Sequence, residues 1–136
     1  MDKSIEIFFE HGLPGFENLQ HFSITRAFAE TELYYLQSTE EPDVCFLCIN
    51  PFQYTKQYEF TMPEPIQQAL SIKRLEDVAV FNIVTINGDL EQATVNLQAP
   101  VIINISLSQG MQVVLNDPAL HIREPLKSLL QGTVEK

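Results

Sequence analysis

The sequence contains few positive charges and no tryptophan. Lys and Arg total 8 against 18 Asp and Glu, which gives a formal net charge of −10 at pH 7. A surface with that charge repels the phosphate backbone of RNA or DNA. We therefore expect no direct contact with nucleic acid, and we expect attraction to positively charged protein partners.

Long hydrophobic runs are also missing. The longest apolar run, Val44 to Ile49, is far shorter than the roughly 20 residues that a membrane-spanning helix needs. The first residues, Met1 to Glu10, mix charged and aromatic side chains, which is unlike a signal peptide. We expect a cytoplasmic protein that does not enter a membrane.

The chain has only two cysteines and three histidines. Cys45 and Cys48 match the Cys-x-x-Cys pattern of redox proteins and half of a zinc site, but they lie in an apolar, strand-like run. Residues i and i+3 of a strand lie about 10 Å apart on opposite faces, too far for a disulfide. Because His11, His21 and His121 are scattered, two further zinc ligands are lacking. We expect two separate reduced thiols and no metal or cofactor.

No arrangement typical of an enzyme is present in the sequence. A Gly-x-Ser-x-Gly nucleophile motif is missing. The acidic residues Glu40, Glu41 and Asp43 surround Pro42, and we interpret them as a solvated loop, not as a catalytic pair. We predict that the protein is not an enzyme.

Turn-forming residues recur along the chain, and the segments between them are rich in Val, Ile, Phe, Tyr and Thr, as is typical of β-strands. The predicted strands are Ile5–Phe9, Leu19–Ile24, Leu33–Gln37, Val44–Asn50, Gln57–Phe60, Val78–Ile86, Ala93–Gln98, Val101–Leu107 and Met111–Leu115. Strands at this spacing predict one mainly β domain over residues 1–136, built as a compact, antiparallel, barrel-like sheet. Both faces of Val78–Ile86 are apolar, so this strand should be central and covered on both sides.

Two turns have a specific backbone reason. Asn87-Gly88 predicts a type I′ hairpin turn between the strands on either side of it, because both residues accept positive φ. In Leu13-Pro14-Gly15-Phe16, Pro14 and Gly15 suit the two central positions of a type II turn.

One or two short helices are expected. One begins near Glu64, where Pro63 or Pro65 fits the first turn. The other lies in the tail, Leu126 to Lys136, which we expect to be flexible or weakly amphipathic. The buried amides Asn82, Asn96 and Asn104 should be hydrogen-bonded and structural, with a ligand-binding role as the second interpretation.

These features favour a protein-binding role, and the alternative is a small barrel that carries an apolar molecule. Interface anchors are usually aromatic. We therefore predict partner contacts at Phe16 and at the aromatic turn that contains Asn50, Phe52 and Tyr54.

Several segments, taken in order, resemble the bacterial flagellar assembly factor W (FliW) family. They are Gly12–Glu17, Asn50–Phe52, Tyr58–Phe60, Phe81–Thr85 and Thr94–Asn104, of which the last is the most specific. The resemblance implies a β-barrel-like domain with a regulatory role. It also implies two partners: the carbon storage regulator, a dimeric repressor that binds mRNA, and flagellin. Family members prevent this repressor from blocking flagellin translation.

Overall fold

The structure, a computed structural model, describes residues 4–28, 31–51, 62–86 and 88–128. Nine strands of this part form one sheet. They are β1 (Ile5–Phe8), β2 (His21–Arg26), β3 (Leu33–Ser38), β4 (Cys45–Ile49), β5 (Val78–Thr85), β6 (Thr94–Val95), β7 (Val101–Asn104), β8 (Gln109–Gln112) and β9 (Glu124–Pro125). The structure also has helix α1 (Glu64–Ala69) and the 3₁₀ turns η2 (Leu75–Asp77) and η3 (Leu90–Gln92).

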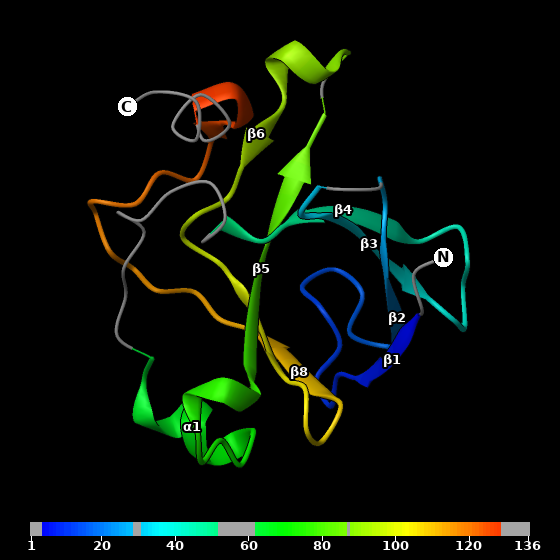
Figure 1. The fold of residues 1–136 in the computed structure, drawn as a ribbon, viewed down its shortest axis with the longest axis vertical. Coiled ribbons are helices and arrows are strands. Elements are labelled where there is room, and N and C mark those ends of the chain that lie inside the picture. Colours follow the sequence, from blue (N-terminus) through cyan, green and yellow to red (C-terminus); the bar gives the residue numbers. More distant parts are fainter. Residues whose placement is uncertain (1–3, 29–30, 52–61, 87, 129–136) are drawn as a thin grey trace.

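The sheet closes into a barrel. Its strand order is β4-β3-β2-β1-β8-β7-β5, and β5 pairs back with β4 to complete a ring of seven strands (Figure 1). Neighbours in the ring are antiparallel except β1 and β8, which run parallel. The expected mainly β, barrel-like fold is therefore confirmed. Closure also pairs β7 on both sides, so its all-apolar run Val101–Ile103 is not an exposed edge.

Strands β6 and β9 extend the sheet outside the ring. The long strand β5 pairs with β7 through Val78–Phe81 and with β6 through Val84 and Thr85. Strand β9 then pairs with β6. The result is a short ribbon that rises from one end of the barrel (Figure 1).

Apolar side chains fill the barrel interior. The buried set is Ile7, Phe9, Leu13, Phe22, Ile24, Leu36, Cys48, Phe81, Val101 and Ile103. Phe9 and Phe22 meet edge to face with ring centroids 5.3 Å apart, and Tyr34 meets Phe81 in the same way at 5.0 Å. Such packed aromatic pairs contribute to a single, well-ordered core.

Two further clusters cover the outside of β5. On the side of α1, Val80 packs with Leu70, Ile102 and Val113. Toward the β6 ribbon, Val84 packs with a second set: Leu33, Ile49, Ala93, Val95, Leu97 and Leu126. Because Phe81 faces the interior while Val80 faces α1, both faces of β5 are covered, as its apolar pattern predicted.

Helix α1 begins as its sequence predicted. Pro63 precedes it, and Glu64 places a negative charge at its positively polarised first turn. It ends at Ala69 with Leu70 as its C-cap, and Ser71 then takes a positive φ of 53°. No residue of α1 itself is buried, so Leu70, which is 3% exposed, anchors this segment to the barrel.

The structure corrects several sequence-based boundaries. Strand β2 begins at His21 and not at Leu19, and β8 spans Gln109–Gln112 and not Met111–Leu115. Strands β5 and β6 form the predicted antiparallel hairpin, but their pairing ends at Thr85 and Thr94, so residues 86–93 connect them in place of the predicted two-residue turn. The predicted strand Val101–Leu107 ends at Asn104, where a turn begins. The β6–β9 pairing was not predicted.

Two predicted segments lie partly or wholly outside the described residues. The strand Gln57–Phe60 lies outside them altogether, as does Asn87. In the tail, residues 126–128 begin a helical turn with Leu126 buried, and residues 129–136 lie outside.

Candidate partner-binding surfaces

The two cysteines lie on opposite faces of β4. Cys45 is exposed and pairs across the sheet with Gln37, whereas Cys48 is buried in the barrel interior opposite Tyr34. Both thiols are free, as predicted. Burial raises the pKa of both thiols, of Cys48 strongly, so neither has the lowered pKa of a redox nucleophile. Across the residues that the structure describes, no group of three or more His, Cys, Asp or Glu side chains could hold a metal ion.

The turn at Leu13–Phe16 closes one end of the barrel. The Phe16 backbone N–H donates to the Leu13 carbonyl at 2.7 Å, and Gly15 has a φ of +85°, as the predicted type II turn requires. Gly12 is also constrained, because a Cβ there would lie 2.6 Å from the Phe16 carbonyl oxygen. Leu13 is 1% exposed and joins the interior cluster. The turn thus inserts Leu13 into the core and leaves Phe16 at the surface.

The Phe16 side chain is partly exposed and packs against another aromatic ring. Its ring meets Phe46 of β4 edge to face, with centroids 5.6 Å apart, and 36% of the residue remains exposed. An aromatic side chain that is already held in one orientation loses little entropy when a partner covers it. This geometry suits the contact role that the sequence predicted for Phe16.

Of the other predicted contact residues, the structure describes Asn50, which lies away from Phe16. Asn50 follows the far end of β4 from Phe46, about 13 Å along the strand. It is half-buried, and its backbone N–H donates to the Glu32 carbonyl at 3.0 Å. Phe52 and Tyr54 lie outside the described residues. The structure therefore places Phe16 and Asn50 at different ends of β4 and does not join them into one site.

Hydrogen bonds fix the start of the acidic loop between β3 and β4. The Glu40 carboxylate accepts hydrogen bonds from the backbone N–H groups of Gln20 at 2.9 Å and His21 at 3.3 Å. These bonds lower the pKa of Glu40. Buried Ser38 supports the loop, because its Oγ accepts from the N–H groups of Glu40 and Glu41. As predicted, the carboxylates are solvated, and Glu40 has a structural role at the start of β2.

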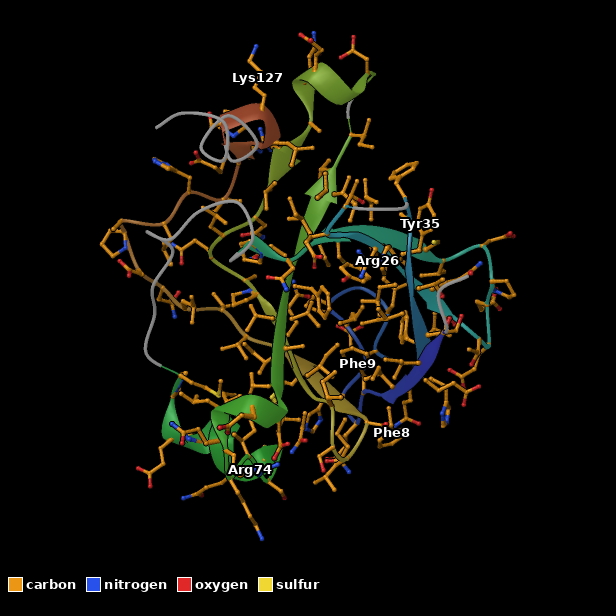
Figure 2. The ribbon with its side chains drawn as sticks, viewed as in Figure 1. Phe8, Phe9, Arg26, Tyr35, Arg74 and Lys127 are labelled. Carbon is orange, nitrogen blue, oxygen red and sulfur yellow. The ribbon has the colours of Figure 1, made fainter. Side chains whose placement is uncertain are left out.

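An exposed aromatic pair lies on the outer wall of the barrel. Phe28 is 51% exposed and Tyr35 is 41% exposed, and their rings lie 6.5 Å apart. Nearby, the Arg26 guanidinium forms an ion pair with Glu32 at 3.5 Å and lies over the Tyr34 ring at 5.4 Å. Figure 2 shows Arg26 and Tyr35 in this upper part of the barrel wall. Sequence analysis did not single out this pair.

Beyond α1, a hollow of about 430 Å³ opens between two segments that are distant in sequence. We call it the Lys73 hollow, and its lining residues are Ser71, Lys73, Asp77, Asn104, Ser106 and Leu107. The two segments also carry exposed aliphatic residues: Leu75 at 83%, Leu107 at 49% and Ile105 at 41%.

The small-molecule carrier alternative requires an open barrel interior. Figure 2 places Phe9 inside the ring of strands, where it is fully buried, and the core side chains named above fill the space around it. The Lys73 hollow lies outside the ring and is lined mainly by polar residues. None of these features favours a carrier.

Comparison with known proteins identifies the family. The sequence profile of the FliW protein family matches residues 1–126. The chain belongs to the FliW family. A flagellar assembly factor FliW from Caldicellulosiruptor saccharolyticus is 46% identical over 96% of this chain and 85% of its own length. One from Clostridioides difficile is 34% identical over 90% of this chain and 94% of its own length. A crystal structure of the flagellar assembly factor FliW matches with a TM-score of 0.81 at 33% identity, covering 89% of this chain and 84% of that one.

Two of the segments that carry the FliW resemblance, Phe81–Thr85 and Thr94–Asn104, contribute strands β5, β6 and β7. Within them, the Asn82 amide Nδ2 donates to the Asn96 carbonyl at 2.9 Å, and the Asn96 side-chain oxygen accepts from the Gln98 N–H at 2.9 Å. Asn104 donates to the carbonyls of Leu70 at 2.8 Å and Ser71 at 3.4 Å. The structural role predicted for these asparagines is confirmed. No helix of the described ranges is long and apolar enough to cross a membrane.

Proposed function

We propose that this FliW-family protein is a regulatory binding protein of flagellar assembly and not an enzyme. In this proposal it binds the carbon storage regulator in the cytoplasm and prevents that repressor from blocking flagellin translation. It also binds flagellin. The observation that carries the proposal is the FliW family match over residues 1–126, with relatives named flagellar assembly factor at up to 46% identity.

Flagellin and the regulator should compete for this protein, so that export of flagellin frees it to bind the regulator. The experiment titrates flagellin into the preformed complex with the regulator and follows binding of flagellin leader RNA by the regulator. We expect flagellin to release the regulator, which then binds the RNA again. A stable ternary complex with unchanged RNA binding would contradict the switch.

Charge supports attraction to a basic repressor and argues against contact with its RNA. With a net charge of −10, this protein should associate quickly with a positively charged partner, and the association rate should fall as salt screens the attraction. Stopped-flow mixing at low and high salt measures this effect. The protein alone should not shift the leader RNA in a gel at physiological salt. A clear shift would refute that part of the proposal.

Phe16, together with Asn50, Phe52 and Tyr54, remains our proposal for partner contacts. Phe16→Ala should weaken binding of flagellin or the regulator about tenfold, since aromatic anchors often contribute that much or more. Its melting temperature should change little because the side chain is partly exposed. The matched control is Phe28→Ala, which removes another exposed aromatic ring. Equal effects of the two substitutions on binding would remove Phe16 from the contact set.

Phe52→Ala tests the predicted aromatic turn in the same binding assay. We expect weaker binding of flagellin or the regulator with little change in the melting temperature. A large loss of stability would instead assign Phe52 to the core.

A further inference from the structure

We propose that the backbone N–H and C=O groups of Gln112 and Val114 bind an extended peptide segment of a partner protein as an additional β-strand. We call these four backbone groups the open edge. The peptide segment should have apolar residues at its centre and lysine or arginine at its ends. This inference is independent of the proposed function, because it rests on backbone geometry, sequence and charge.

The chain that leaves β8 is paired on one side only. The Val113 N–H donates to the Pro100 carbonyl at 2.9 Å. Two residues later, the Leu115 N–H donates to the Gln98 carbonyl at 2.8 Å. Successive residues of an extended strand direct their N–H and C=O groups to opposite sides. The groups of the open edge therefore face away from this pairing.

On the opposite side, the chain after β1 turns away before it reaches the open edge. Strands β1 and β8 lie side by side in Figure 1, and the Phe8 N–H donates to the Ser108 carbonyl at 2.9 Å. Beyond this contact the chain turns, since Gly12 has a φ of +64° and its N–H donates to the Phe9 carbonyl at 3.0 Å. Among the residues that the structure describes, no hydrogen bond uses the N–H groups of the open edge.

The sequence does not protect this edge against pairing. Proteins usually protect an exposed strand edge with proline, with charged side chains or by keeping the strand short. Strand β9 has all three protections, because it consists of Glu124 and Pro125 alone. Residues 111–116, in contrast, contain neither proline nor a charged side chain, and Val114 is 60% exposed. An uncharged edge with an exposed β-branched side chain is a template for strand addition.

The segment that carries the open edge is held in place by its neighbours. Val113 is buried and packs with Leu70, and the Gln112 side-chain Nε2 donates to the Ala99 carbonyl at 2.9 Å. Asn116 then takes a positive φ of 59°, which ends the extended run. The edge is therefore ordered before a peptide arrives, which lowers the entropic cost of binding. Its length suits a peptide of about five extended residues.

The charges around the open edge select the ends of the peptide. No lysine or arginine occurs in residues 75–122, the stretch that supplies β5, β6, β7 and β8. At one end of the edge, Glu10 lines a small pocket together with Met111. At the other end, Asp117 follows the extended run. Cationic residues at the ends of a peptide are attracted to these carboxylates, whereas an acidic peptide is repelled.

The test uses a synthetic peptide of sequence Lys-Val-Thr-Val-Thr-Val-Lys, blocked at both ends, and the full chain labelled for NMR. Amide chemical shifts and amide hydrogen exchange are recorded with and without the peptide. A second peptide carries glutamate in place of both lysines. Val114→Pro removes one N–H group of the open edge, and Val114→Thr is the matched control that keeps it. Thermal melting checks that both variants are folded.

We expect the amides of Gln112 and Val114 to exchange quickly in the free protein and to become protected when the lysine peptide binds. Val114→Pro should weaken binding at least about tenfold, and Val114→Thr should stay within about twofold of the parent. The glutamate peptide should bind at least about tenfold more weakly than the lysine peptide.

Four results would overturn the inference. They are protection of both amides in the free protein, which would mean that another segment or a second copy already covers the edge; no saturable binding of the lysine peptide; binding that leaves both amides unchanged; and equal affinity of Val114→Pro and the parent. If Val114→Pro does not fold, the exchange measurement on the parent protein decides.

Discussion

Gly110 of β8 is predicted to be required for full stability, because it lies against Phe9 and Ile7 where β8 meets β1. A Cβ at this position would lie 2.8 Å from Cε2 and from Cζ of Phe9, and 3.1 Å from Cγ2 of Ile7. Phe9 has no exposed surface, and its ring packs edge to face against Phe22. The ring therefore has little room to move away from a new methyl group.

The sign of the stability change in Gly110→Ala distinguishes a steric clash from the usual gain on replacing glycine. Without a clash, Gly→Ala inside a strand stabilises a protein by about 0.5–1 kcal/mol. Overpacking a filled core costs about 1–3 kcal/mol. For Gly110→Ala we therefore expect a net loss of about 1–2 kcal/mol in the free energy of unfolding, measured by urea denaturation.

A double-mutant cycle isolates the contact. Phe9→Leu alone should destabilise the protein, because it leaves a cavity. The combined Phe9→Leu, Gly110→Ala variant should lose less free energy than the sum of the two single losses, since the smaller side chain makes room for the methyl group. A Gly110→Ala variant as stable as the parent, or strictly additive losses, would refute the reasoning.

Three further predictions concern single side chains. Asn104→Leu should lower the free energy of unfolding by about 2–4 kcal/mol, because it leaves the Leu70 carbonyl and the Leu107 N–H without their amide partner. Urea denaturation measures this loss, and an unchanged free energy of unfolding would contradict the prediction. Cys45 should react with a thiol reagent in the native state, more slowly than free cysteine because burial raises its pKa, whereas Cys48 should react only on unfolding. Peptide mapping identifies the labelled sites, and equal labelling of both cysteines in the native state would contradict this. Glu40→Gln should lower stability at neutral pH. The pKa of Glu40 is lowered in the folded state, so the carboxylate contributes to stability above its unfolded pKa, and this contribution is lost as the pH falls through the folded pKa. The stability difference between variant and parent should therefore shrink below about pH 4. A difference in denaturation midpoints that stays constant with pH would argue against this.

Much of the barrel could be predicted because its signals are local. Alternating apolar residues on both faces of Val78–Thr85 identify a central strand, since each face must be covered by something. Pro14 and Gly15 have backbone preferences that specify one turn type before any tertiary contact forms. The placement of Cys45 and Cys48 on opposite faces follows directly from the two-residue period of a strand.

The failed predictions involve contacts between distant segments. Asn87-Gly88 is a strong signal for a tight turn, but β6 pairs with β9 as well as β5, and the 3₁₀ turn η3 occupies part of the connection. The connection between β5 and β6 is therefore longer than the two-residue turn that this dipeptide favours. Strand β9 itself is only two residues long and contains Pro125, so its sequence carries almost no strand signal.

The candidate surfaces also differ in whether local sequence or long-range contacts determine them. The surface position of Phe16 could be predicted because a turn motif places it at a corner, whereas its contact with a partner stays a prediction. The Lys73 hollow could not be predicted, because its lining residues come from two segments, 71–77 and 104–107, that meet only when β5 and β7 pair. Asn104 shows why. Its amide within an apolar strand predicted that buried hydrogen-bond partners exist, yet only the folded chain identifies them as the carbonyls after α1. Binding surfaces built from such long-range contacts therefore have to be found in the structure, even where the sequence already specifies the strands that carry them.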